Sequence, residues 1–377
     1  MAEKIVLIDG HSILNRAFFG LPDLTNSEGL HTNAIYGFLN IMLKLLDEEK
    51  PEYLTVAFDV HAPTFRHEMY EEYKGTRKPM ADELRQQVPV MKEVLRSMGI
   101  RIIEQEGLEA DDLLGTLSKR CESEGMDVTI ISGDRDLLQL ATDKVKIRIP
   151  KTKQGRTEVE DYYAADVKER YQVTPLEFID MKALMGDTSD NIPGVPGIGE
   201  KTAAKIITEY HSIENAYQHA GELKPPRASK AIVEYWDMAV MSKKLAAICV
   251  DASLDYDIES ARLGNIFTEE AYTLFQKLQF KNLLSRFEVK GPSHAVEDSF
   301  RTAGSREEAE RILEEASEAE TLGVAVFRRT AEALPLFAGE ARIGGVALCF
   351  GEKEIYCIPE EKMEIAELLE KLEKLSA

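Results

Sequence analysis

The stretch KIVLIDG, residues 4–10, decides the fold, because four consecutive apolar residues run directly into an aspartate and a glycine. Short apolar runs rich in branched residues are typical of strands that are buried on both faces. Similar runs recur at 53–58, 128–131 and 145–149. Between them, stretches such as 34–46 and 82–98 repeat apolar residues every three or four positions, which predicts helices. The alternation predicts an α/β fold, a parallel sheet flanked by helices.

The pattern changes after residue 174. From about 175 to 285 the strand pattern is absent, and the sequence predicts helices separated by Gly and Pro. A Gly-Pro-Ser break then precedes strand-like stretches and an acidic helix, at 322–327, 343–350, 355–358 and 362–375. The sequence therefore predicts an α/β core, a helical subdomain and a partial α+β domain, over 1–174, 175–290 and 298–377.

The composition is that of an ordinary globular protein. The 377 residues are 44% hydrophobic and 30% charged, and no apolar run near the start is long enough for a signal peptide or a membrane span. The four cysteines lack metal-type spacing, which disfavours a zinc site. We therefore expect a cytoplasmic protein. The net charge of −21 argues against a nucleic-acid partner, but residues 144–157 hold six Lys or Arg and no acid, so acids and bases are segregated.

Acids follow three of the four predicted strands. Asp9 ends the first strand, Asp59 follows the second, and Asp134 and Asp136 follow the third. Ligands of open parallel sheets lie beyond the carboxyl ends of the strands, so we expect these acids to meet there. Two further acidic clusters lie at a predicted helix start and beside a predicted turn. The full set is Asp9, Asp59, Glu109, Asp111, Asp112, Asp134, Asp136, Asp187 and Asp190.

Taken singly, each of these acids could equally be a helix cap or a solvated loop residue. Together, nine like charges at one edge of a sheet would repel one another unless cations neutralise them. Oxygen ligands without His or Cys favour Mg²⁺, or alternatively Mn²⁺, over zinc. One Mg²⁺ needs fewer acids than this, so two ions fit better, and two ions are the arrangement used in phosphodiester cleavage. The acids therefore predict a nuclease.

A second signal is a tight Gly-rich turn at 192–203, between two predicted helices. Glycines let backbone amides approach a phosphate, and lysines one helical turn apart add a Coulomb attraction. Such a helix-hairpin-helix turn would bind DNA by its structure rather than its sequence. The alternative is a turn that only joins two structural helices. The candidate DNA-binding residues are Gly194, Gly197, Gly199, Lys201, Thr202 and Lys205.

The segment at 65–79, which follows Asp59, interleaves basic and aromatic residues. Lys74, Arg77 and Lys78 lie within one or two turns of a predicted helix, with Tyr73 beside them. This composition suits gripping a phosphate and stacking an unpaired base. The alternative is a solvated helix face.

The order of these motifs resembles the 5′ nuclease domains of bacterial DNA polymerase I, which belong to the flap endonuclease family. The motifs are IDGH at 8–11, FD at 58–59, APTFRHE at 62–68, YKxxR at 73–77, EADD at 109–112, GDRD at 133–136, GDxxDN at 186–191 and GVxGIGxKTA at 194–203. The resemblance covers about 1–290 and implies a PIN-like sheet and a helical arch at 66–79. It also implies a 5′-3′ exonuclease and flap endonuclease acting on 5′ flaps, nicks and RNA-primer ends in repair and Okazaki fragment processing.

The resemblance implies a role for each candidate residue. The first metal would be held by Asp59, Glu109 and Asp111, with Asp112 beside it and Asp9 reaching it through water. The second metal would be served by Asp134, Asp136, Asp187 and Asp190. Lys74 and Arg77 would steer or polarise the scissile phosphate. Arg66 and Tyr73 would contact DNA, Tyr73 near the unpaired nucleotide. The hairpin would hold the duplex backbone, in the family often with a bound K⁺.

Residues 298–377 resemble the start of the 3′-5′ exonuclease-like domain that comes next in such polymerases. Active versions carry an Asp-x-Glu pair on the first strand, whereas residues 322–329 read LGVAVFRR. Proofreading needs those carboxylates as metal ligands, so we expect this domain to be inactive. We also expect no polymerase activity, a monomer associated with the bacterial nucleoid, and a polymerase module in cis or in trans. The sequence leaves open whether the chain is a natural short protein or a fragment.

Two other functions remain as alternatives. One is a non-catalytic DNA-binding scaffold that docks a polymerase, which the full set of acids disfavours. The other is a PIN-type metal nuclease acting on RNA, which needs only the acid cluster. The hairpin at 194–203 and the segment at 66–79 disfavour this second alternative.

Overall fold

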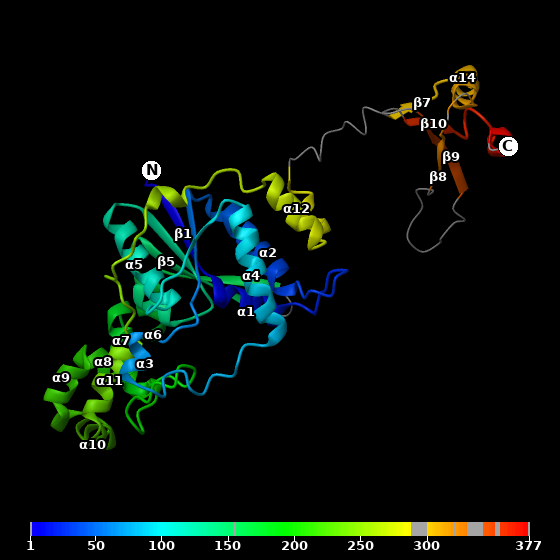
Figure 1. The fold of residues 1–377 in the computed structure, drawn as a ribbon. Coiled ribbons are helices and arrows are strands. Elements are labelled where there is room, and N and C mark those ends of the chain that lie inside the picture. The colour runs from blue at the N-terminus through cyan, green and yellow to red at the C-terminus, as the bar shows by residue number, and fades with distance from the viewer. Residues whose placement is uncertain are drawn as a thin grey trace. The chain divides into compact units, whose positions relative to one another are not determined.

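A computed structural model describes residues 2–153, 156–287, 300–317, 319, 321–329, 342–350 and 355–375. The chain folds into two compact units, Met1–Phe287 and Glu288–Ala377 (Figure 1). The first unit therefore holds both the predicted α/β core and the predicted helical subdomain through residue 287.

The first unit is built on a six-stranded sheet with the order β3-β2-β1-β4-β5-β6. The strands are β1 (Lys4–Asp9), β2 (Tyr53–Ala57), β3 (Arg101–Ile103), β4 (Asp127–Ile131), β5 (Val145–Lys153) and β6 (Arg156–Tyr162). The first five strands are parallel, and β6 is antiparallel to β5. The predicted parallel sheet is thus confirmed. The sequence pattern missed β3, which has only three residues, and β6, whose residues are mostly polar.

Helices cover both faces of this sheet. Side chains alternate along a strand, so Ile5 and Leu7 of β1 point to one face, where they belong to a core shared with Leu113 and Leu117 of α5 (Ala110–Ser123). The other face is covered by three helices (Figure 1). They are α1 (Gly10–Gly20), α2 (Asn33–Glu49) and α4 (Asp82–Ser97). The central strands are therefore buried on both sides, as their continuous apolar runs predict.

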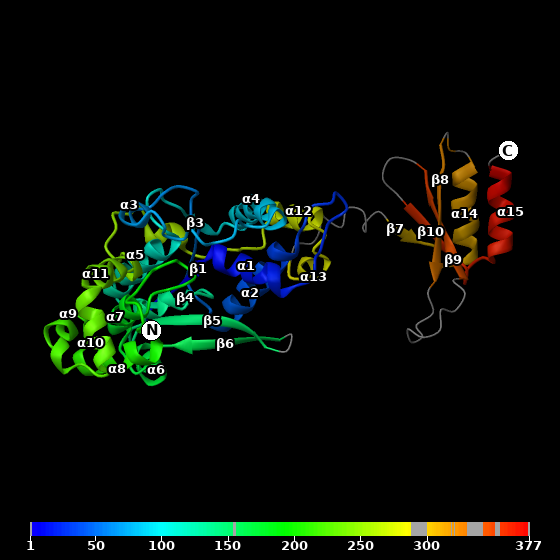
Figure 2. The same ribbon diagram turned by 90° about the horizontal axis from the view of Figure 1, so that it is seen from below.

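Helices α6 to α11 gather at one end of this unit (Figure 2). They are α6 (Ala164–Tyr171), α7 (Pro175–Met185), α8 (Glu200–Tyr210), α9 (Ile213–Gln218), α10 (Pro226–Glu234) and α11 (Trp236–Ala246). The chain then returns to the opposite end through α12 (Glu269–Lys277) and α13 (Lys281–Leu284). Residues 175–285 are all described and contain no strand, as predicted.

The second unit has a sheet of order β7-β10-β9-β8. Its elements are β7 (Phe300–Thr302), α14 (Arg306–Ser317), β8 (Gly323–Arg329), β9 (Arg342–Cys349), β10 (Ile355–Pro359) and α15 (Ile365–Leu375). The predicted strands at 343–350 and 355–358 are present as β9 and β10 and pair antiparallel, and α14 and α15 lie side by side on one face of the sheet (Figure 2). In neither unit does a described helix combine the length and apolar character needed to cross a membrane.

Candidate active site

Eight of the nine candidate carboxylates line one cavity of the first unit, with a volume of about 1730 Å³. The eight are Asp9, Asp59, Glu109, Asp111, Asp134, Asp136, Asp187 and Asp190. The ninth, Asp112, does not reach this cavity. Residues separated by some 180 positions in the sequence thus meet in one place.

The strand order explains why the three acids that follow predicted strands, Asp9, Asp59 and Asp134, meet. Strand β1 lies between β2 and β4, and Asp9, Asp59 and Asp134 all stand at or just beyond the carboxyl ends of these three parallel strands. Asp9 also caps α1, because its Oδ1 accepts from the Ser12 backbone N–H at 3.0 Å. Ser132 Oγ donates to Asp9 Oδ2 at 2.7 Å, which ties the end of β1 to the loop after β4.

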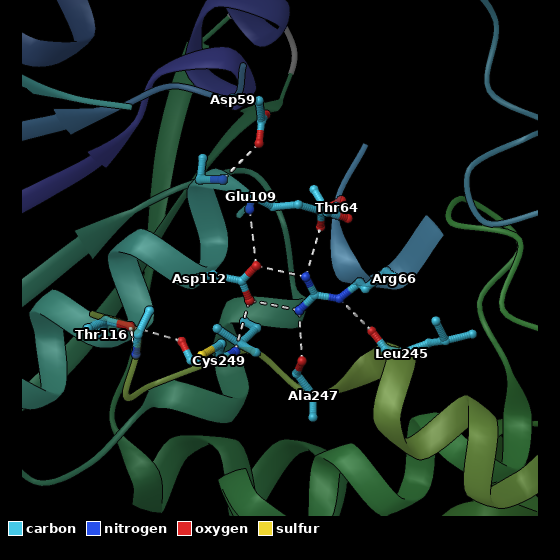
Figure 3. Close-up of polar contacts among 12 residues, drawn as sticks. Asp59, Thr64, Arg66, Glu109, Asp112, Thr116, Leu245, Ala247 and Cys249 are labelled. Carbon is cyan, nitrogen blue, oxygen red and sulfur yellow. Dashed lines mark hydrogen bonds and ion pairs between the residues drawn. The ribbon is translucent and has the colours of Figure 1, made fainter. Parts of the chain in front are cut away.

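Helix α5 brings two more acids to the same edge. Glu109 is its N-cap residue, and Asp111 lies in its first turn. The Ala110 backbone N–H donates to Asp59 Oδ1 at 2.7 Å, so the start of α5 is joined to the loop after β2 (Figure 3). Negative charge at this end of a helix is favoured by the helix dipole, and α5 therefore helps to stabilise the acids it carries.

A buried lysine holds the acids at the far side of the cavity. Lys182, near the end of α7, is 8% exposed, and its Nζ lies 2.6 Å from Asp136 Oδ1 and also pairs with Asp187. Lys182 was not among the residues predicted from the sequence. The available signal was a cation near the end of an apolar helix, one to two turns before the acid at 187.

Lys74, Arg77 and Tyr73 also turn toward the acids. Lys74 Nζ donates to Glu109 Oε1 at 2.7 Å, and Arg77 pairs with Asp190. Residues 70–81 form turns and irregular structure, with Lys74 in the left-handed region at φ +56°. The expected helix around Lys74 and Arg77 is therefore wrong, because only α3 (Phe65–Met69) is helical before α4. Ion pairs to the cavity acids, rather than a helix, place these two cations.

The expected stacking of Tyr73 on a nucleotide is not compatible with its position. Tyr73 is 3% exposed, and its hydroxyl oxygen lies 3.1 Å from both Glu109 Oε2 and Asp190 Oδ2, so that its one proton is shared between these two acceptors. Tyr73 instead links two of the acids, so its ring packs in the interior and offers no free face to a base.

Arg66 and Asp112 also differ from expectation. They are 2% and 0% exposed and form a two-pronged ion pair, with both N···O distances 2.8 Å (Figure 3). The predicted DNA contact of Arg66 and the predicted metal contact of Asp112 are therefore wrong in this structure. The sequence could not separate Asp112 from Asp111, because both are aspartates in the first turn of the same helix.

Burial and mutual repulsion shift the pKa values of the acids in the cavity. Burial raises the pKa of Asp111 well above its usual range, and the charges of Asp9 and Asp134 add to the effect. Burial also raises the pKa of Asp9 to about 6, against the hydrogen bonds from Ser12 and Ser132. By contrast, burial of Asp59 is outweighed by hydrogen bonds from His11 and Ala110, and its pKa is lowered to about 2.

Asp136 lies between opposing influences. Burial is the largest effect on this carboxyl, and the Asp134 charge adds to it, so that the pKa of Asp136 rises to about 7 although Lys182 lowers it. Several acids of the cavity thus resist ionisation, mainly because they are buried and in addition because other acids lie close by. A bound cation would relieve this repulsion.

The chemistry of these donors fits a hard divalent cation. All eight lining acids offer carboxylate oxygens, which Mg²⁺ and Mn²⁺ prefer. Within the described residues, no three His, Cys, Asp or Glu side chains already stand close enough together to coordinate one ion. Lys74, Arg77 and Lys182 lie among the acids instead, where they pair with Glu109, Asp190, Asp136 and Asp187.

The Gly-rich turn joins α7 to α8, as predicted. Gly194 is buried at φ +62°, a Cβ there would collide with the backbone of Gly186, and its N–H donates to Ser242 Oγ at 3.1 Å. The predicted DNA contact of Gly194 is therefore wrong, because this glycine serves internal packing. Gly197, at φ +82°, and Gly199 are exposed.

The helix that follows the turn presents free positive charge. Lys201 and Lys205 of α8 are exposed, Thr202 between them is half-buried, and neither lysine forms an ion pair with the described residues. The basic stretch at 144–157 is different. Its Lys146 and Arg148 pair with Glu49 at 2.6 and 2.8 Å, so part of the segregated charge that the sequence indicates is neutralised there.

Comparison with protein families assigns the first unit. Residues 4–172 match the family described as 5′-3′ exonuclease, N-terminal resolvase-like domain. Residues 173–269 match the family described as 5′-3′ exonuclease, C-terminal SAM fold. Both matches lie before the second unit.

Similar curated proteins are bacterial DNA polymerases. The chain is 46% identical over 288 residues to DNA polymerase I of Bacillus caldotenax, covering 76% of this chain and 33% of that protein. It is 45% identical over 284 residues to DNA polymerase I of Bacillus subtilis, covering 75% of this chain and 32% of that protein. The chain therefore spans about a third of the length of these relatives.

Solved structures share the fold of the first unit. A bacteriophage T5 5′-exonuclease with bound divalent metal ions (zinc) has a TM-score of 0.54 and 21% identity, covering 76% of this chain and 99% of that chain. The T5 D15 flap endonuclease in a complex with DNA and metal ions has a TM-score of 0.54 and 22% identity, covering 76% and 96%. These likenesses agree with the PIN-like sheet flanked by helices.

Proposed function

The chain belongs to the 5′-3′ exonuclease family through residues 4–269, and from this premise we propose that it is a structure-specific 5′ nuclease. It would act as 5′-3′ exonuclease and flap endonuclease on 5′ flaps, nicks and RNA-primer ends, in repair and Okazaki fragment processing. The observation that carries the proposal is the single cavity lined by eight carboxylates and by Lys74 and Arg77.

The proposed cofactor is a pair of Mg²⁺ ions, with Mn²⁺ as the alternative. Asp59, Glu109 and Asp111, with Asp9 close by, would hold one ion. Asp134, Asp136, Asp187 and Asp190 would hold the other. When bound, such ions supply Lewis acidity and an activated water for phosphodiester hydrolysis.

The cations of the chain then have a defined task. Lys74 and Arg77 neutralise Glu109 and Asp190 in this structure. Once the acids hold other cations, both side chains become available to a phosphate at the mouth of the cavity. There they would stabilise the negative charge that develops as the phosphodiester is cleaved.

Duplex binding is proposed for the turn before α8. The exposed backbone at Gly197 and Gly199 and the charges of Lys201 and Lys205 would contact phosphates of one strand, Thr202 would assist, and K⁺ could sit at the turn. Contacts of this kind read no bases, so recognition would depend on the shape of the substrate.

The rest of the proposal concerns a polymerase partner and the place in the cell. The matched residues make up about a third of the length of these DNA polymerases, so a polymerase module would act in cis or in trans. The protein would be a monomer on the nucleoid in the bacterial cytoplasm. Strand β8 reads GVAVFRR and carries no carboxylate, so the second unit would lack 3′-5′ exonuclease activity.

The decisive experiment measures cleavage of a 5′-end-labelled flap duplex by the purified chain, in Mg²⁺ and in EDTA, with single-stranded RNA as the matched substrate. We expect Mg²⁺-dependent cleavage near the junction of single and double strand and no cleavage in EDTA. Flap binding without cleavage in Mg²⁺ would instead identify a scaffold. Preference for the single-stranded RNA would identify a nuclease of the PIN type.

A further inference from the structure

The Arg66–Asp112 ion pair lies behind the cavity and has no role in the chemistry proposed above. Both N···O distances are 2.8 Å, and the two side chains are 3% and 0% exposed. Arg66 uses two further donors on the backbone of the segment at 245–249, with Nε at 3.0 Å from the Leu245 carbonyl and Nη2 at 2.8 Å from the Ala247 carbonyl (Figure 3). Four of the five N–H donors of Arg66 are bonded in this way, and Nη1 also lies 3.5 Å from Glu109 Oε2. Because the side chain is 3% exposed, these donors are not available to DNA.

Asp112 is satisfied to the same degree. Besides Arg66, it accepts from the Cys249 backbone N–H at 2.9 Å and from the Glu109 backbone N–H at 3.1 Å (Figure 3). The pair thus connects three parts of the first unit: α3, the start of α5, and the segment at 245–249, which begins at the end of α11. Gln139 also holds this segment: its side chain donates to the Ala246 carbonyl at 3.0 Å and accepts from the Ile248 N–H at 2.8 Å.

The pair also contacts the acids of the cavity. Arg66 Nη1 lies 3.5 Å from Glu109 Oε2, and Asp112 holds the Glu109 backbone. Glu109 in turn pairs with Lys74. A substitution of Arg66 or Asp112 would therefore disturb Glu109, a predicted metal ligand, and through it Lys74, a predicted catalytic cation, although neither of these two is itself substituted.

We propose that Arg66 and Asp112 are positioning residues of the nuclease site, acting as one unit. They hold α3, the start of α5 and residues 245–249 in one arrangement, so that Glu109 and Asp111 face the cavity, while neither Arg66 nor Asp112 touches an ion or DNA. This inference rests on the proposed nuclease function. It also predicts different roles for two adjacent acids of α5: Asp111 binds the ion, whereas Asp112 binds Arg66 and the protein backbone.

The test is a double-mutant cycle on the full chain. Arg66→Gln or Asp112→Asn alone leaves one buried charge without its partner, whereas the double variant is a neutral pair that keeps part of the hydrogen bonding. We expect each single change to lower kcat on the flap substrate by about 10–100-fold, the cost typical of losing a group that orients a metal ligand. Because the residues act as a unit, the double variant should lose no more than the worse single variant. If the losses multiply, the two residues act separately and the proposal is wrong.

A second measurement does not depend on cleavage. Mn²⁺ binding to the DNA-free protein is measured by calorimetry for the parent, the double variant and Asp111→Asn. The double change keeps the net charge of the site, so we expect its Mn²⁺ affinity to stay within about threefold of the parent, while Asp111→Asn loses about tenfold or more. A tenfold loss in the folded double variant would make Asp112 a ligand and overturn the proposal. If the parent binds Mn²⁺ but cleaves no substrate, the proposed function is wrong. The comparison of Mn²⁺ affinities still tests whether Asp112 is a ligand.

Arg66→Lys gives a third measurement, and it applies even if the neutral variants do not fold. Lysine keeps the charge but cannot donate along two prongs while also binding two carbonyls. We expect kcat to fall about tenfold or more with the Kd for flap DNA in EDTA unchanged. Weaker DNA binding with unchanged kcat would return Arg66 to the role of a DNA contact and contradict the proposal. The matched control is Lys374→Met with Glu370→Leu, an exposed pair in the second unit with a N···O distance of 2.8 Å, which should alter neither quantity.

Discussion

The cavity side and the inner side of α5 carry adjacent aspartates with opposite surroundings. Asp111 faces a cavity shared with seven other carboxylates, where burial and repulsion raise its pKa. Asp112, the next residue, is fully buried and bound by Arg66 and two backbone N–H groups. On the cavity side, negative charge is only partly neutralised, which favours the binding of a cation. On the inner side every charge has its partner, which is the mark of a structural role.

The strongest test of this contrast removes an acid from the cavity side. Asp134→Ala deletes a carboxylate that no Lys or Arg of the described residues neutralises, so we expect a predicted ion site to be lost and flap cleavage to fall by about 10³-fold or more. Binding of flap DNA in chelator should remain. Cleavage rates in Mg²⁺ are compared with Asp143→Ala, an exposed acid outside the cavity. Comparable rates in both variants would mean that the cavity is not the site of the reaction.

The second test concerns a cation on the cavity side. Lys74→Ala should lower kcat by about 10²-fold, because Lys74 is expected to stabilise charge that develops during cleavage. Single-turnover cleavage at saturating substrate measures the effect. Lys119→Ala, an exposed lysine of α5, serves as the control. A higher KM with unchanged kcat would show that Lys74 only contributes to binding.

The third test uses pH. The folded-state pKa values of Asp9 and Asp136 are raised to about 6 and about 7, so between pH 4 and 7 the folded protein binds more protons than the unfolded chain. In chelator, stability should therefore rise by about 1–3 kcal/mol as pH falls from 7.5 to 5. The lowered pKa values of Asp59 and Asp187 act the other way, and their contribution is lost as pH falls below about 4.

Urea unfolding at several pH values measures this dependence. Asp136→Asn, which cannot titrate at that position, should weaken it, and bound Mg²⁺ should do the same by neutralising the acids. If stability in chelator instead increases steadily from pH 5 to 7.5, the acids on the cavity side are not under mutual repulsion.

The smallest expected effect concerns two lysines of α8, which belong to neither side of α5. Lys201→Ala with Lys205→Ala should weaken duplex binding by several-fold and reduce the salt dependence of the binding constant by about 1–2 units of slope. The cleavage rate at saturating substrate should not change. Lys151→Ala is the control, since Lys151 already pairs with Glu160 at 2.5 Å. Equal loss in the control would mean that general charge, rather than the turn before α8, binds the duplex.

Much of the first unit could be predicted from local pattern. Apolar runs such as residues 5–8 and 128–131 become buried strands because only a sheet covered on both faces can hide them. Three acids could be placed at one edge because parallel strands bring their carboxyl ends together. The short strand β3 and the polar strand β6 escaped prediction, since neither has enough apolar residues to give a pattern.

The direction of individual side chains could not be predicted in the same way. A basic and aromatic segment looks alike whether it faces DNA or the protein interior, and Arg66 and Tyr73 proved to be interior. Gly194 belongs to a motif that suits phosphate binding, yet it is needed for packing against Gly186. Lys182 gave only a local signal, its position one to two turns before Asp187, because its other partner, Asp136, is distant in the sequence.

By itself, the sequence determined most of the strands and helices and which acids follow the strands, because both depend on the spacing of neighbouring residues. The tertiary structure alone decided that β1 lies between β2 and β4 and that eight acids therefore share one cavity. It also decided that Asp112 turns inward to Arg66 while Asp111 does not. Such choices depend on which distant groups come within hydrogen-bonding distance once the chain has folded, and spacing along the chain carries no information about that.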